Sequence, residues 1–270
     1  MGDWATSGAG VWKGSFGLHS ISGATANTKG AWEQATGTPS MGGCRGMWLA
    51  IDWAGNHATK RTIVADIGVG PSGSQIVLIE NFMYTPGTDF NRSRQQGHSV
   101  YFPMVVPNEL LWMRTQSSMA NNADVYISAF PIFGGPPGFG SKCDTYGVNT
   151  STSLGTSVVA GASENVWGAW TEITSSCNRV RALIVHIDSG ALSLPQNEQW
   201  VFFDIGIGPA GAEVAVQNAY TSNCGSDQIM HPQYHGPFAV DIPSGSRISI
   251  RMATQWGVQK TRYFALYGIR

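Results

Sequence analysis

One segment of the chain occurs twice. Residues 65–77 read ADIGVGPSGSQIV, and residues 203–215 read FDIGIGPAGAEVA. The recurring aspartates are 204 − 66 = 138 positions apart, about half of the 270-residue chain. Solenoid repeats are far shorter, at roughly 20–50 residues per unit. The repeat therefore predicts two copies of one small domain.

The glycines of this repeat fit the G-x-G-x-x-G pattern of dinucleotide-binding proteins. That pattern requires the third glycine to begin a helix whose N-terminus receives the pyrophosphate. The residues that follow, 74–79 and 212–216, are rich in strand formers and have no helical period. We therefore predict strand, turn, strand in both copies, and no bound cofactor. The predicted turn residues are Asp66, Gly68, Gly70, Gly73, Asp204, Gly206, Gly208 and Gly211.

Composition excludes several classes of function. Charged residues make up 12% of the chain, about half of the usual ~25%, so solubility rests on uncharged polar residues or on a surface covered by partners. The net charge of −1 gives no basis for nucleic-acid binding. No apolar run is long enough to insert in a membrane. The N-terminus lacks a secretory signal, and four scattered cysteines indicate free thiols in a reducing cytoplasm.

Each half contains about eight short apolar segments separated by Gly, Pro or Asn turns. This pattern predicts an all-β protein of two tandem antiparallel β-sandwich domains, jelly-roll-like, that arose by internal duplication. An immunoglobulin-like sandwich is the alternative, weakened by the missing Cys…Trp…Cys spacing. The expected boundaries are 1–134 for the first copy, 135–144 for a Gly/Pro linker and 145–270 for the second copy. Long loops are expected over 81–97 and 218–236.

Residues 247–252 (RISIRM) alternate strictly and predict a strand. Aligning Arg114 with Arg251 turns Leu111 and Met113 inward and Trp112 outward, beside Ser249. Large apolar patches are rarely exposed on monomers, so an outward tryptophan predicts a covering partner. The candidate interface or glycan-contact residues are Trp112, Arg114, Arg251 and Trp256. Of the other tryptophans, Trp32 and Trp170 recur and are predicted to be core, whereas the unshared ones are predicted to be interface anchors or sugar-stacking platforms.

The candidates for catalysis and metal binding are weak. A pair of catalytic carboxylates must flank one substrate, but Asp66 and Asp204 lie in separate copies. We expect each to accept backbone N–H groups at its turn, and Arg114 and Arg251 to pair with them or with a neighbouring subunit. His231-x-x-x-His235 would converge on a metal only from a helix, and prolines flank it. The sequence predicts no catalytic centre and no metal site, with the two histidines left open.

Three segments of the second copy resemble a known group. They are 204–208 (DIGIG), 242–247 (IPSGSR) and 266–268 (LYG), and they resemble uncharacterised β-sandwich proteins of tailed-bacteriophage virions. The first copy departs at 107–109 (PNE), where the glycine is absent. The resemblance implies a tail, fibre or capsid-decorating subunit without catalytic residues. We therefore expect a non-enzymatic virion protein, made in a host cytoplasm.

The expected partners follow from this resemblance and from the low charge. They are other virion proteins, copies of the same chain and a host surface glycan, without nucleic acid or membrane insertion. The alternative function is a carbohydrate-binding module or lectin that uses loop tryptophans. A glycan-degrading enzyme is a more distant third.

Overall fold

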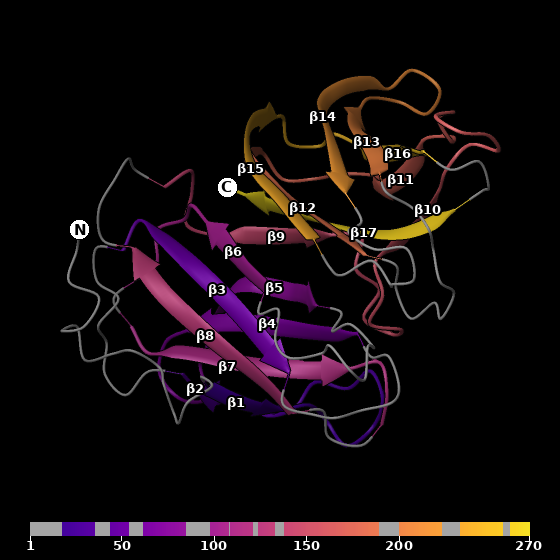
Figure 1. Cartoon of the computed structure of the whole chain (residues 1–270). Helices are drawn as coiled ribbons and strands as arrows, with labels where there is room; N and C mark the ends of the chain where they lie inside the picture. The colour runs from indigo at the N-terminus through magenta and orange to yellow at the C-terminus, as the bar shows by residue number, and fades with distance from the viewer. Residues whose placement is uncertain are drawn as a thin grey trace.

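The computed structural model is built from β-strands (Figure 1). It describes residues 18–35, 44–53, 62–84, 98–107, 109–120, 124–132, 138–188, 200–222, 233–255 and 260–270. Within these stretches, no helix is long and apolar enough to cross a membrane. Trp4, Trp12, Cys224, His231 and Trp256 lie outside them.

In the described stretches of the first copy there are eight strands, and the first pairs with the last, the second with the seventh, and so on inwards. They are β1 (Leu18–Ile21), β2 (Glu33–Gln34), β3 (Gly46–Trp53), β4 (Ile63–Val69), β5 (Ile76–Tyr84), β6 (His98–Phe102), β7 (Leu111–Ser117) and β8 (Asp124–Ile132). β1 pairs with β8, β2 with β7, β3 with β6 and β4 with β5, all antiparallel. The resulting sheets, β1-β8-β3-β6 and β2-β7-β4-β5, form an eight-stranded jelly roll.

The second copy repeats this order. Its strands are β10 (Thr156–Val159), β11 (Thr171–Thr174), β12 (Val180–Asp188), β13 (Trp200–Ile207), β14 (Val214–Ser222), β15 (Gln233–Ile242), β16 (Ile248–Thr254) and β17 (Thr261–Ile269). β10 pairs with β17, β11 with β16, β12 with β15 and β13 with β14. The predicted tandem jelly rolls are confirmed, and the immunoglobulin-like alternative is wrong because the strand order differs.

The two copies are joined through a continuous sheet. Strand β9 (Cys143–Tyr146) pairs antiparallel with β17 and, at Cys143 and Ile79, parallel with β5. This creates the order β15-β12-β17-β9-β5-β4-β7-β2, with β10 also on β17. Figure 1 shows β9 between the two halves. Strand β9 therefore begins inside the segment 135–144 predicted as a linker, and residues 139–142 of that segment hydrogen-bond to Pro103, Val105 and Arg270.

The two copies also share apolar packing. One buried cluster lies within the second copy, around Phe203, Ile250 and Phe264. The other fills the first copy and also includes second-copy residues, namely Ala182, Ile184, Ala265, Tyr267 and Ile269. The central strands β12 and β17 of the sheet β10-β17-β12-β15 therefore bury both of their faces, one against their own sandwich and one against the first copy.

The strand register agrees with the sequence pattern. Leu111 and Met113 are fully buried, as are Ile248 and Ile250, because alternate residues of a strand face one side of a sheet. The predicted long loops are too long, however. β5 continues to Tyr84, β14 to Ser222, and β15 begins at Gln233, so residues 81–84, 218–222 and 233–236 belong to strands.

The repeated turn has the predicted conformation. Gly70 and Gly208 have φ values of 121° and 120°, and Gly73 and Gly211 both have 82°. These are left-handed values that favour glycine. Each turn leads into a strand, β5 or β14, which confirms the strand-turn-strand prediction. Cys44, Cys143 and Cys177 are free and buried, as expected for the described thiols.

Candidate functional site

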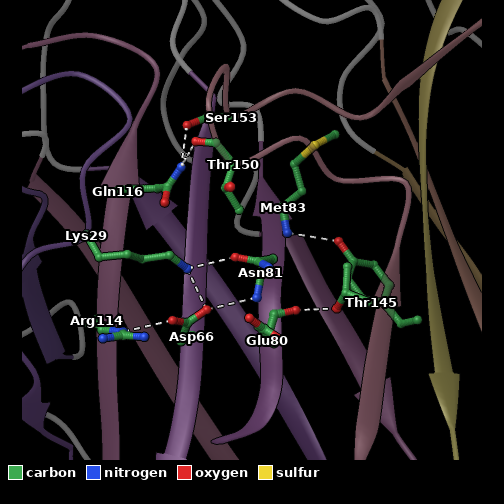
Figure 2. A network of polar contacts seen from close by, with 11 residues as sticks. Lys29, Asp66, Glu80, Asn81, Met83, Arg114, Gln116, Thr145, Thr150 and Ser153 are labelled. Carbon is green, nitrogen blue, oxygen red and sulfur yellow. Dashed lines mark hydrogen bonds and ion pairs between the residues drawn. The ribbon is translucent and has the colours of Figure 1, made fainter.

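The recurring aspartate of the first copy lies at the centre of a polar cluster on the outer face of β4 (Figure 2). Asp66 is 1% exposed and pairs in register with Arg114 on β7. Arg114 Nε donates to Asp66 Oδ2 at 2.8 Å, and Lys29 Nζ donates to Oδ1 at 2.5 Å and to Asn81 Oδ1 at 2.9 Å. The Arg114 guanidinium also lies 4.6 Å from the centre of the Trp32 ring, within range of a cation–π interaction.

The second copy contains an equivalent cluster in which a tryptophan stands at the position of Lys29. Arg251 Nε donates to Asp204 Oδ2 at 2.8 Å, and its guanidinium lies 4.6 Å from the Trp170 ring centre. Trp167, which is 138 positions after Lys29, lies on the same guanidinium at 4.8 Å. A cation that pairs with the acid in one copy is therefore replaced by an aromatic ring that covers the arginine in the other.

The charged partners of both aspartates come from within the fold. The predicted structural role of Asp66 agrees with the geometry, but its backbone donor is the N–H of Asn81 at 2.9 Å rather than a turn N–H. Both aspartates have arginine partners across the sheet, which is the first of the two pairings expected. Burial lowers the pKa of Lys29 despite the nearby Asp66. Trp32 and Trp170 are half-buried over the arginines, so their prediction as core residues is wrong.

Trp112 is the clearest correction. It pairs with Gly68 in register and so belongs to the outer face, as expected. It is nevertheless only 7% exposed, and its Nε1 donates to the Gly70 carbonyl at 2.7 Å. The chain itself covers this face, since a Cβ at Gly68 would lie 3.1 Å from the Trp32 ring. Trp112 therefore needs no partner subunit, and the interface predicted at this residue is wrong.

In the second copy, an arginine rather than a tryptophan binds the carbonyl group of the equivalent turn. Arg247 Nη1 donates to the Gly208 carbonyl at 3.2 Å and to Glu213 Oε1 at 2.7 Å, and Arg247 Nε donates to Glu172 Oε2 at 2.6 Å. The Arg247 hydrogen bond lowers the pKa of Glu213. The indole of Trp112 and the guanidinium of Arg247 thus bind equivalent turn carbonyls from different positions, since Trp112 corresponds to Ser249.

A second polar cluster, formed by His186, Asp188 and Tyr234, lies buried between the two copies. His186 Nε2 lies 2.8 Å from Asp188 Oδ2, and both side chains are fully buried. Tyr234 packs edge-on against His186 and donates to the Met83 carbonyl at 2.6 Å. This histidine–aspartate pair has no access to solvent, so the geometry favours a structural role.

His235, half of the histidine pair considered from the sequence, lies on β15 beside Phe203. Burial, with a contribution from His186, lowers the pKa of His235. Its predicted companion His231 lies outside the described residues. In the described part of the chain, no group of three or more His, Cys, Asp or Glu side chains is arranged to hold a metal.

Exposed aromatic side chains gather on the outer face of the second copy. Phe202 is 36% exposed and Trp200 is 37% exposed, and both lie on the same face of β13 as Asp204. Trp167, at 39% exposed, covers Arg251 on neighbouring β16. We call Trp167, Trp200 and Phe202 the aromatic face. Comparing residues 138 positions apart would have found it, because Phe202 and Trp200 correspond to Val64 and Thr62.

A groove of about 530 Å³ lies at the junction of the two copies. The first copy and the connecting segment contribute Val105 and Phe139, both partly exposed. The second copy contributes the guanidinium groups of Arg179, Arg181 and Arg270. Two of these are held by carboxylates: Arg179 binds Asp241 through two hydrogen bonds, and Arg270 Nε donates to Asp144 at 2.5 Å. No sequence pattern indicated this groove, because its walls are formed by residues remote from one another in the chain.

The fold defines a protein of two fused jelly rolls. No protein-family model matches the chain, and a search of curated proteins gives no significant match. Among solved structures, the chain is similar to PNGase F, a glycosylasparaginase from Flavobacterium meningosepticum, with 8% identity, 93% of this chain and 96% of that chain covered, and a TM-score of 0.40.

Two further structures show a weaker similarity. They are Broad Bean Stain Virus, with 10% identity, 93% of each chain covered and a TM-score of 0.33, and the tandem CBM22 domains of Paenibacillus barcinonensis Xyn10C, with 9% identity, 92% and 85% covered and a TM-score of 0.28. Similarity this weak carries no functional argument, so function must be argued from the chain itself.

Proposed function

We propose that this chain is a non-enzymatic structural subunit of a virus particle, and specifically a tail, fibre or capsid-decorating protein of a tailed bacteriophage. The observation that carries the proposal is the union of the two jelly rolls through one sheet and one shared core. Domains joined by a small polar interface move relative to each other. A large apolar junction instead makes a single stiff body, which suits a building block better than a hinged enzyme.

The use of the polar residues supports the same conclusion. The recurring aspartates and arginines pair with each other within the fold, whereas exposed aromatic rings gather on the aromatic face. Surfaces of this kind serve protein contacts more often than catalysis. The resemblance of segments 204–208, 242–247 and 266–268 to phage virion proteins points in the same direction.

The test is direct. Particles purified from a culture infected with the virus that encodes the chain should contain it in stoichiometric amounts by quantitative mass spectrometry. The protein should remain on the particles through a density gradient. Its presence in the lysate but absence from gradient-purified particles would contradict the proposal.

The junction groove favours a second candidate function, binding of an acidic saccharide. Arginine, asparagine and exposed aromatic side chains are the groups that bind sugar hydroxyls, carboxylates and ring faces. The groove presents Arg181, Asn178 and Phe139 together. A glycan array with the intact protein and with Arg181→Ala tests this candidate. Signals on acidic glycans that disappear in the variant would support it, whereas signals that persist would locate binding elsewhere.

A further inference from the structure

The side chains of Lys29 and Asn81 meet on the outer face of the first jelly roll (Figure 2). Lys29 Nζ lies 2.9 Å from Asn81 Oδ1, although the two residues are 52 positions apart in the chain. The amine is therefore in contact with an atom that is bonded directly to Asn81 Cγ, the carbon of the carboxamide group. A lysine amine held against a carboxamide can act as a nucleophile towards that carbon.

The carboxylate of Asp66 holds both of these residues in place. Its Oδ1 accepts from Lys29 Nζ at 2.5 Å and from the backbone N–H of Asn81 at 2.9 Å. Its Oδ2 accepts from Arg114 Nε at 2.8 Å, which leaves Oδ1 directed at the amine. Asp66 is 1% exposed, so this carboxylate is shielded from bulk water. A buried carboxylate in contact with an amine is placed to accept its proton and to pass it on.

The backbone at Asn81 is irregular where the two side chains meet. The register between β4 and β5 shifts around Asp66, so that Glu80 and Asn81 together oppose this one residue. Asn81 has a left-handed φ of 53°, which is uncommon for residues other than glycine. Such β-bulges redirect a side chain and often occur beside functional sites. The bulge therefore places the Asn81 carboxamide against Lys29 at a cost in backbone strain.

The second copy keeps the recurring aspartate and arginine but has a different residue at each of the two reacting positions. The positions equivalent to Lys29 and Asn81 are 29 + 138 = 167 and 81 + 138 = 219, and they hold Trp167 and Ala219. The register opposite Asp204 is also regular, without the extra residue. The amine, the carboxamide and the bulge are thus present together in one copy and replaced together in the other, as expected for groups that act as a pair.

We propose that Lys29 and Asn81 join through an amide bond, an isopeptide crosslink within the chain, with Asp66 transferring the protons. Asp66 takes a proton from the Lys29 ammonium, and the neutral amine attacks Asn81 Cγ to form the Nζ–Cγ bond. Asp66 then delivers this proton to Asn81 Nδ2, the Cγ–Nδ2 bond breaks, and ammonia leaves with the electron pair of that bond. A second proton of Nζ passes through Asp66 to the ammonia. The products are a neutral amide and an ammonium ion, so the reaction needs no further reactant.

The setting favours this reaction. Burial lowers the pKa of Lys29, although Asp66 opposes the shift, and a lower pKa makes the neutral amine easier to form. Fixed contact between the two groups replaces a collision between separate molecules. The bond ties β5 to the segment before β2, across β4 and β7. It forms once in each chain and acts on no external substrate, so the inference goes beyond the proposed structural function and is independent of it.

Mass spectrometry of the full-length protein tests the proposal. The wild-type chain should be lighter than its sequence by one molecule of ammonia, and proteolysis should release one branched peptide that contains both Lys29 and Asn81. Lys29→Arg keeps the positive charge and Asn81→Ala removes the carboxamide, so both variants should have the full mass of their sequences. Asn218→Ala is the matched control, because Asn218 lies opposite Asp204 in the equivalent register. This control should retain the loss of ammonia.

Circular dichroism of each variant shows whether it folds, and Lys29→Arg carries the test if Asn81→Ala does not. An asparagine can also lose ammonia by closing a ring with its own backbone, but that product would persist in Lys29→Arg. A wild-type chain that keeps its full mass even after prolonged incubation, or a loss of ammonia that persists in Lys29→Arg, overturns the proposal. In folded Asp66→Asn the crosslink should be absent, and its presence there overturns the role given to Asp66.

The crosslink and the particle function can fail separately. A chain that is found in purified particles at its full mass overturns only the crosslink. A crosslinked chain that is absent from purified particles overturns the particle function instead.

Discussion

The backbone N–H of Met83 donates a hydrogen bond to the phenolic oxygen of Tyr267 at 2.8 Å, across a separation of 184 residues. The carbonyl of the same methionine accepts from Tyr234 at 2.6 Å. Met83 stands near the end of β5, beyond the position where β9 pairs with that strand. The phenol groups of Tyr267 and Tyr234 in the second copy therefore bind both backbone polar groups of Met83 in the first copy.

Replacing Tyr267 with phenylalanine should destabilise the protein by about 1–3 kcal/mol, because the Met83 N–H loses its buried acceptor while the ring is kept. Tyr267 is fully buried, so water cannot take the place of the hydroxyl. Urea unfolding followed by tryptophan fluorescence measures the change. Tyr146→Phe is the control, since Tyr146 accepts from Asn178 in an exposed setting at 3.3 Å. An equal loss in both variants would contradict the role given to Tyr267.

The two jelly rolls should unfold together. Neither can open without exposing the core that both share, and domains with a common core behave as one cooperative unit. Differential scanning calorimetry should give a single transition whose calorimetric and van't Hoff enthalpies agree. Two separate transitions would show that the junction contributes little to stability.

The recurring aspartates should differ in their contribution to stability. Asp66→Asn should cost about 3 kcal/mol, because it leaves Lys29 and Arg114 without their common anion in a buried site. Asp204→Asn should cost less, about 1–2 kcal/mol, because Arg251 keeps its two tryptophan rings. Urea midpoints of the two variants provide the comparison. A larger loss of unfolding free energy for Asp204→Asn than for Asp66→Asn would contradict this prediction.

Stability should fall in alkaline solution. Burial raises the pKa of Tyr267 and of Tyr234 above the ordinary value of 10.0. Below about pH 10 both phenols are protonated in the folded and unfolded states, so their contribution is fully present. Above this pH the unfolded state releases protons that the folded state keeps, and the free energy of unfolding decreases by up to about 1.4 kcal/mol per pH unit for each phenol.

Lys29 acts in the opposite direction, because its pKa is lowered in the folded state. One lysine does not offset two buried phenols and the buried Cys143 thiol, whose pKa is also raised. Urea midpoints measured from about pH 8 to pH 11 should therefore decline at the alkaline end. Tyr267→Phe should make the decline shallower, and a flat profile for the wild-type chain would contradict the prediction.

Short-range patterns in the sequence were sufficient to predict the fold of each half of the chain. Left-handed φ values at Gly73 and Gly211 and strict alternation in β16 depend on backbone geometry that is local to a few residues. The offset of 138 between Asp66 and Asp204 identified the duplication, and Arg114 and Arg251, 251 − 114 = 137 positions apart, recur beside them. The same comparison, extended to Val64 and Phe202, would have revealed the aromatic face.

The sequence by itself determined two jelly rolls, their repeated turns and which side of β7 and β16 faces inward, because these follow from periodicity and turn chemistry. Only the tertiary structure decided what covers the outer faces. Trp112 is outward in register yet buried, and its indole N–H binds the Gly70 carbonyl of the same copy. The hydrogen bonds of Met83 with Tyr267 and Tyr234 join residues 184 and 151 positions apart, and no local pattern records such contacts.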